Sequence, residues 1–127
     1  MATRGLSHIN FRGTRELLDQ LKDFYCDVVG LRVGERPPFP DFGYWLYAGG
    51  QPIVHLYQAG PQEVRHSDVA TAFDHVAFDC EDSGAVEAVL RERAIPYRRA
   101  LVPATQQVQF FVVDPAGTKV ELNFARG

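Results

Sequence analysis

Four residues with metal-binding side chains recur at matching places in the two halves of the chain. They are His8, His55, His75 and Glu121. The distance along the sequence from His8 to His55 is nearly the same as that from His75 to Glu121. Imidazole nitrogens and carboxylate oxygens are ligands for divalent Fe, Zn, Ni, Co and Mn. We therefore predict one divalent-metal site built from His8, His75 and Glu121, with His55 as a fourth ligand.

The matching places belong to an internal repeat. The first half begins with LSHINF and the second with FDHVAF, and each run puts a histidine third in a strand-like segment. Further on, WLYAGGQPIVHLY aligns with FVVDPAGTKVELNF, so that His55 coincides with Glu121. AGGQP and DPAGT contain the Gly and Pro that hairpin turns require. Each half therefore predicts the order strand, helix, strand, strand, strand.

The helices and strand faces follow from the spacing of apolar residues. Apolar residues recur at helical spacing after Thr14, and again after Asp82 and Ser83, which are suitable N-cap residues. In the last strand of each half, apolar residues alternate with the predicted ligands, as in VHL and VEL. The apolar faces are expected to pack against the helices, which leaves the ligands on the opposite faces.

These elements predict an α+β fold. Two βαβββ modules would form one open, curved mixed sheet with the helices outside. We expect a single domain over residues 1–127, with modules at 1–58 and 72–127 and a polar connector at 59–71.

Composition limits the possible partners and the location. The chain has 127 residues, of which 46% are hydrophobic, and a formal net charge of -3. These values fit a folded soluble domain and give no general attraction to nucleic acid or to acidic membranes. The sequence has no long apolar run, and MATRGLSHINF lacks the apolar core of a signal peptide. A cytoplasmic protein that binds neither nucleic acid nor membranes is expected.

A pocket should surround the metal, because residues two positions apart on a strand share a face. We predict that six residues line it: Asn10, Trp45, Tyr47, Phe73, Gln109 and Phe111. This aromatic lining with a few amides suits a small-molecule substrate that has an apolar body and an oxygen pair for the metal.

Several segments resemble one known superfamily. LSHINF, DFYCDVVGLRVGERP, FDHVAF and FVVDPAGTKVELNF together resemble the vicinal oxygen chelate superfamily, which includes glyoxalase I, extradiol dioxygenases and bleomycin resistance proteins. The resemblance covers nearly the whole chain. It implies the paired βαβββ fold, a divalent metal, a small-molecule substrate and a homodimer.

The resemblance leaves the reaction open. Glyoxalase I uses four ligands at the positions of His8, His55, His75 and Glu121, and normally has Glu at the position of His55. Extradiol dioxygenases use three of these ligands, with a Tyr where this chain has Phe111. We expect isomerase or lyase chemistry, in which the metal acts as a Lewis acid and Glu121 or His55 moves a proton. The alternatives are an Fe(II) ring-cleaving dioxygenase of the extradiol type and a binding protein that sequesters a small molecule without turnover.

Overall fold

The computed structural model describes residues 2–63, 65 and 71–125, and the chain forms two modules of the same design. Module 1 consists of β1 (Ile9–Gly13), α1 (Arg15–Phe24), η1 (Tyr25–Val29), β2 (Arg32–Gly34), β3 (Gly43–Ala48) and β4 (Gln51–Gln58). Module 2 consists of β5 (His75–Cys80), α2 (Ser83–Glu92), β6 (Arg98–Val102), β7 (Gln107–Val113) and β8 (Lys119–Phe124). Residues 64 and 66–70 of the predicted connector lie outside the described residues.

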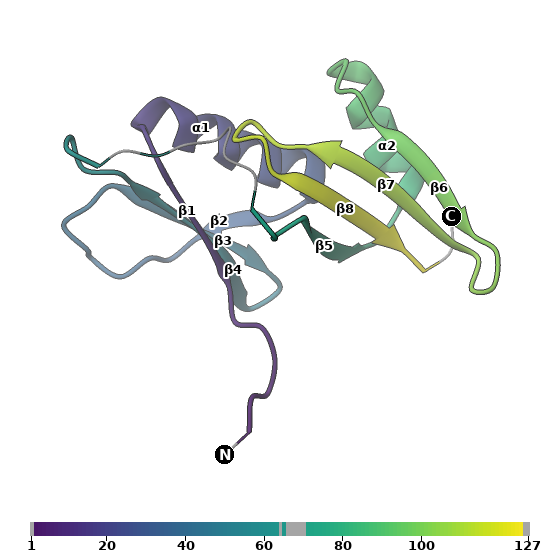
Figure 1. Ribbon diagram of the computed structural model, residues 1–127, viewed down its shortest axis with the longest axis horizontal. Helices are drawn as coiled ribbons and strands as arrows, with labels where there is room; N and C mark the ends of the chain where they lie inside the picture. The colour runs from purple at the N-terminus through teal and green to yellow at the C-terminus, as the bar shows by residue number, and fades with distance from the viewer. Residues whose placement is uncertain (1, 64, 66–70, 126–127) are drawn as a thin grey trace.

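Each module contains one four-stranded mixed sheet. The strand orders are β1-β4-β3-β2 and β5-β8-β7-β6, so the two sheets have the same topology. In each, the first and last strands pair in parallel and the other pairs are antiparallel. The predicted fold of two βαβββ modules is therefore confirmed. In the described part of the chain, the strand hydrogen bonds stay within each module, so the predicted sheet consists of two halves (Figure 1).

The helices begin at the predicted caps. Thr14 Oγ1 accepts a hydrogen bond from Leu17 N, and Asp82 Oδ1 accepts one from Ala85 N. The first helix continues through the π-helical turn η1 and ends at Gly30, whose φ of 93° is favourable only for glycine. No helix in the described part of the chain is long and apolar enough to cross a membrane.

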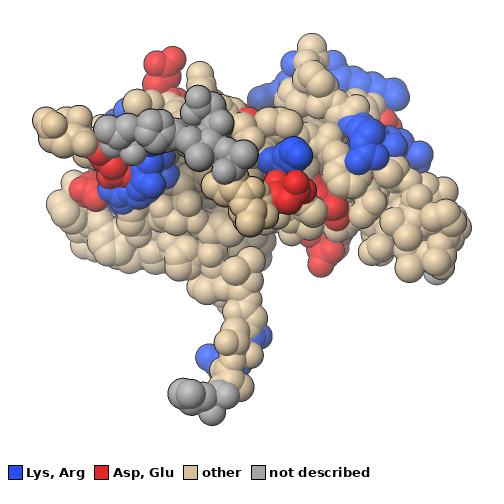
Figure 2. Space-filling model, viewed as in Figure 1, with Lys and Arg blue, Asp and Glu red and all other residues tan. Residues whose placement is uncertain are grey.

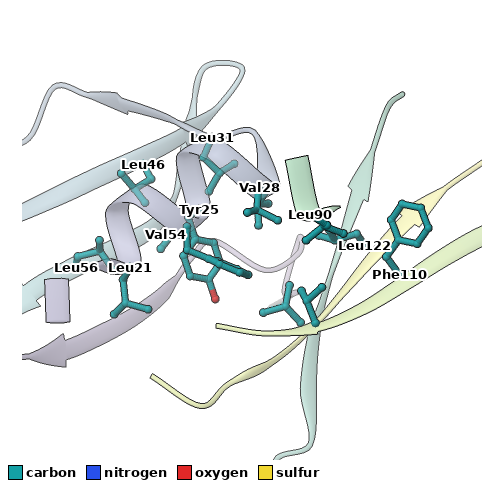
Figure 3. Close-up of a cluster of buried hydrophobic side chains, with 14 of the residues drawn as sticks. Leu21, Tyr25, Val28, Leu31, Leu46, Val54, Leu56, Leu90, Phe110 and Leu122 are labelled. Carbon is teal, nitrogen blue, oxygen red and sulfur yellow. The ribbon is translucent and has the colours of Figure 1, made fainter. Parts of the chain in front are cut away.

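One hydrophobic core joins the two modules. Tyr25 and Val28 lie between core side chains of module 1 and Leu90 and Leu122 of module 2 (Figure 3). The Tyr25 hydroxyl donates a hydrogen bond of 2.6 Å to the Asp114 carboxylate in the β7–β8 turn, and both residues are buried. The core and this hydrogen bond therefore fix how the two sheets are placed.

The charged side chains are distributed unevenly over the surface. Lys and Arg side chains gather over α2 and β6, whereas the lower surface of module 1 in the same view is uncharged (Figure 2).

Candidate metal centre

The histidine pair of module 1 is part of a stack of three rings. His55 on β4 is paired across the strands with Trp45 on β3, and their ring centres are 4.2 Å apart. The His8 ring, just before β1, covers the other face of His55 at 3.8 Å between ring centres. The flanking Val54 and Leu56 point into the core, as the alternation predicted. This stack leaves His55 only 6% exposed.

The stack and its neighbours determine the protonation of His55. Burial, followed by the nearby charge of His8, lowers the pKa of His55 below its usual value, and Arg36 adds to the effect. His55 Nε2 lies 3.0 Å from the carbonyl oxygen of Pro52, which can only accept, so Nε2 carries the proton in the neutral ring. Its Nδ1 therefore holds the free lone pair that a ligand or a base needs.

The pair of module 2 has the spacing of two ligands of one ion. His75 begins β5, and Glu121 lies on the parallel neighbour β8. His75 Nε2 is 3.4 Å from Glu121 Oε1, which is long for a hydrogen bond. Two ligand atoms that each lie about 2.1 Å from a tetrahedral ion are about 3.4 Å apart. The donor types and their separation therefore fit half of a divalent-metal site.

Neighbouring polar groups hold both members of this pair in place. Asp74 Oδ2 lies 2.7 Å from His75 Nδ1, which leaves Nε2 of a neutral ring unprotonated and free to bind. The hydrogen bond from His75 lowers the pKa of Asp74, and Lys119 adds to the effect. Asn123 and Gln109 donate to Glu121 Oε2 at 2.7 and 3.2 Å, so Oε1 faces His75. Such partners commonly orient metal ligands.

The two pairs do not meet within one chain. His55 lies in the sheet of module 1 and His8 stacks on it from just before β1, whereas His75 and Glu121 belong to the sheet of module 2. Among the described residues, which include all four, no three His, Cys, Asp or Glu side chains lie close enough together to hold one ion. Each chain thus presents two separate pairs of candidate ligands, called half-sites below, and the predicted four-ligand group does not form within one chain.

The predicted pocket residues divide between the two half-sites. Trp45 stacks on His55, and Asn10 is the strand partner of His55. Phe111 is the strand partner of Glu121, and Gln109 donates to it. The structure therefore brings these four residues next to predicted ligands, two in each module.

The other two predicted pocket residues lie apart from the described contacts of the ligands. The Tyr47 hydroxyl donates to the carbonyl of Glu35 in the loop after β2, at 2.5 Å. Phe73 is 64% exposed. Sequence reasoning missed Asp74, although a carboxylate directly before a predicted ligand is a usable signal. It also missed Arg36, because only the folded loop brings that side chain near His55.

Comparison with known proteins places the chain among relatives of the same fold. It matches the family model described as Glyoxalase/Bleomycin resistance protein/Dioxygenase superfamily over residues 5–122. It is 35% identical over 109 residues to "Glyoxylase I 4" of Arabidopsis thaliana, which covers 83% of this chain but only 63% of that protein. It is 29% identical over 113 residues to a lactoylglutathione lyase of Haemophilus influenzae, covering 82% of each. The structure of a glyoxylase/bleomycin resistance protein/dioxygenase domain from Frankia sp. EAN1pec is similar with a TM-score of 0.71, at 16% identity, over 98% of this chain and 94% of that one.

Proposed function

Because the chain belongs to the glyoxalase/bleomycin resistance protein/dioxygenase superfamily, we propose that it is a divalent-metal-dependent isomerase or lyase of the glyoxalase type. The observation that carries the proposal is the His75–Glu121 pair, with ligand atoms 3.4 Å apart. The names of two relatives, a glyoxylase I and a lactoylglutathione lyase, support the same reaction class.

The complete site requires a second copy of the chain. The half-site of His8 and His55 in one copy would meet that of His75 and Glu121 in the other. Large apolar side chains on the surface of both modules support association, since Leu6 is 81% and Val33 51% exposed in module 1, and Phe73 is 64% and Val113 56% exposed in module 2.

Proton transfer is the chemistry that the residues favour. A bound divalent ion would polarise a substrate oxygen and so acidify the neighbouring C–H group. The amides of Asn123 and Gln109 hold Glu121 Oε2, so Oε1 is the oxygen that would bind the ion or accept the proton. His55, neutral with a free Nδ1, is a ligand or a second base. Phe111 beside Glu121 has no hydroxyl group, which favours acid–base chemistry over ring cleavage.

Proton exchange tests this proposal without knowledge of the natural substrate. Hydroxyacetone, which has two neighbouring oxygens, would be incubated in deuterated buffer with metal-loaded protein that carries no affinity tag. We expect deuterium to enter next to the carbonyl, and Glu121→Gln to slow this about 100-fold or more. Glu87→Gln, on α2, is the matched control and should exchange normally. No exchange by the wild type, or equal exchange by Glu121→Gln, would refute the assignment.

A further inference from the structure

Module 1 contains three buried hydrogen-bond donors without partners. They are Nε and Nη2 of Arg36 and Nε1 of Trp45, and none of them has an acceptor in the described part of the chain. Most buried polar groups in folded proteins are hydrogen-bonded, so an unpaired donor requires an explanation. Here the three donors come from two residues near His55, one of which stacks on it.

The guanidinium of Arg36 is held with one edge unpaired. Its Nη1 donates to the carbonyl of Asp41 at 2.8 Å. Arg36 Nη2 lies beside Gly43, the strand partner of Tyr57. It fits there because Gly43 has no side chain: a Cβ at this position would come within 2.9 Å of Nη2. The Tyr57 ring centre is 4.9 Å from Arg36 Cζ. Nε and Nη2 form the side of the guanidinium that binds the two oxygens of a carboxylate in parallel.

In the described part of the chain, Arg12 makes the bidentate contact with a carboxylate that Arg36 lacks. Its guanidinium also lies near Tyr57, at 6.0 Å from the ring centre. Arg12 Nε donates to Glu63 Oε2 at 3.0 Å, and Nη2 donates to Oε1 at 3.0 Å. Arg36 has no such carboxylate among the described residues. The positive charge of Arg36 therefore remains available to an external anion.

The ring of Phe39 lies beside both residues that carry the unpaired donors. Its centre is 5.1 Å from Arg36 Cζ and 6.3 Å from the Trp45 ring centre. Phe39 belongs to the proline-rich loop between β2 and β3, is 42% exposed and is not part of the hydrophobic core. An anion would reach the donors by displacing this ring, while the aromatic faces of Trp45 and Tyr57 would remain for the apolar part of the molecule.

We propose that Arg36 and Trp45 bind a carboxylate, and that the substrate is a small carboxylic acid. Two carboxylate oxygens would accept from Arg36 Nε and Nη2, with Trp45 Nε1 as a third donor. The assignment of the ligand as substrate rests on the proposed function, whereas the anion site rests on the unpaired donors alone. The carboxylate group would then orient the molecule against the stack of His55 and Trp45.

Trp45 provides a direct probe, because it is the only tryptophan in the sequence. Metal-free protein would be titrated with benzoate and, separately, with benzamide, its neutral analogue of nearly equal shape. We expect saturable change of Trp45 fluorescence with benzoate, at an affinity at least tenfold higher than for benzamide. Equal affinity for the two, or no binding of benzoate, would overturn the proposal.

Arginine variants identify the donor. Arg36→Met should weaken benzoate binding about 10- to 100-fold, and Arg36→Lys should lie between it and the wild type. The matched control is Arg32→Met, because Arg32 is an exposed arginine of the same module whose Nη2 donates to the carbonyl of Gly49. It should bind benzoate normally. Unchanged binding by Arg36→Met, with a normal melting temperature, would refute the role of Arg36.

The two proposals fail separately. Titration of metal-free protein involves neither the metal nor the reaction. Exchange of hydroxyacetone without benzoate binding would support the isomerase or lyase assignment and refute the carboxylate site. Benzoate binding that depends on Arg36, without exchange, would support the anion site and refute the isomerase or lyase assignment.

Discussion

The bond between Tyr25 and Asp114 is the polar link that should contribute most to the packing of the two modules. Tyr25 Oη donates to Asp114 Oδ2 at 2.6 Å, and the two residues are 0% and 4% exposed. The other carboxylate oxygen accepts from the backbone of Ala116 and Thr118 at 2.8 and 2.9 Å. Tyr25→Phe would remove one oxygen, leave no large cavity, and leave Asp114 Oδ2 buried without its partner.

The expected loss follows from the burial. A hydrogen bond to a charged group contributes about 1.5–3 kcal/mol, and a buried acceptor left unpaired loses most of that. We therefore expect Tyr25→Phe to lower the free energy of unfolding by about 2 kcal/mol. For a chain of 127 residues, this lowers the melting temperature by roughly 7 °C.

Tyr44→Phe is the matched control. Tyr44 Oη donates to Asp19 Oδ1 at the same distance, 2.6 Å, but the Asp19 side chain is 46% exposed. Loss of this hydrogen bond should lower the free energy of unfolding by about 0.5 kcal/mol, because water replaces the bond. Urea and thermal unfolding would be compared at one protein concentration, since association affects apparent stability. Equal losses in the two variants would refute the argument from burial.

Three further predictions concern individual polar contacts. Asp74→Asn should weaken metal binding about 10- to 100-fold in a competition titration with a chelator, because Asp74 orients His75; an unchanged dissociation constant would show that it does not. Hydrogen bonds from Arg12 lower the pKa of Glu63 to about 2, so the stability from this carboxylate is present above its unfolded pKa of about 4.3 and is lost as the pH falls toward 2. The difference in melting temperature between Glu63→Gln and the wild type should therefore disappear at low pH, and a difference that persists would be inconsistent with ionic pairing. Thr14→Ala should cost about 1 kcal/mol of unfolding free energy through loss of the N-cap, whereas Thr14→Ser should cost much less.

Much of the fold could be predicted because its determinants are local. Thr14 and Asp82 have the side chains that cap helices, and both do so. The alternation around His55 and Glu121 indicated which strand face enters the core, and Val54 and Leu122 are fully buried there. The internal repeat then required the second module to have the topology of the first.

The arrangement of the site could be predicted only in part, because it depends on packing between distant segments. Repeat symmetry identified His75 and Glu121 as equivalent to His8 and His55. His8 does lie against His55, and His75 against Glu121. Repeat symmetry could not show that the two pairs stay apart in one chain, which depends on how the core joins the modules. The place of Arg36 depends on the loop conformation and on the space beside Gly43, and neither has a sequence pattern.

We infer that one metal site combines half-sites from two chains. Two variants would be prepared, His8→Ala/His55→Ala and His75→Ala/Glu121→Ala, and each alone should bind no metal. After unfolding and refolding together in equal amounts, half of the dimers should be mixed, and each mixed dimer should contain one complete site. Elemental analysis should then find about one divalent ion per four chains, against one per chain in the wild type. No metal in the refolded mixture, with a normal wild type, would contradict the claim.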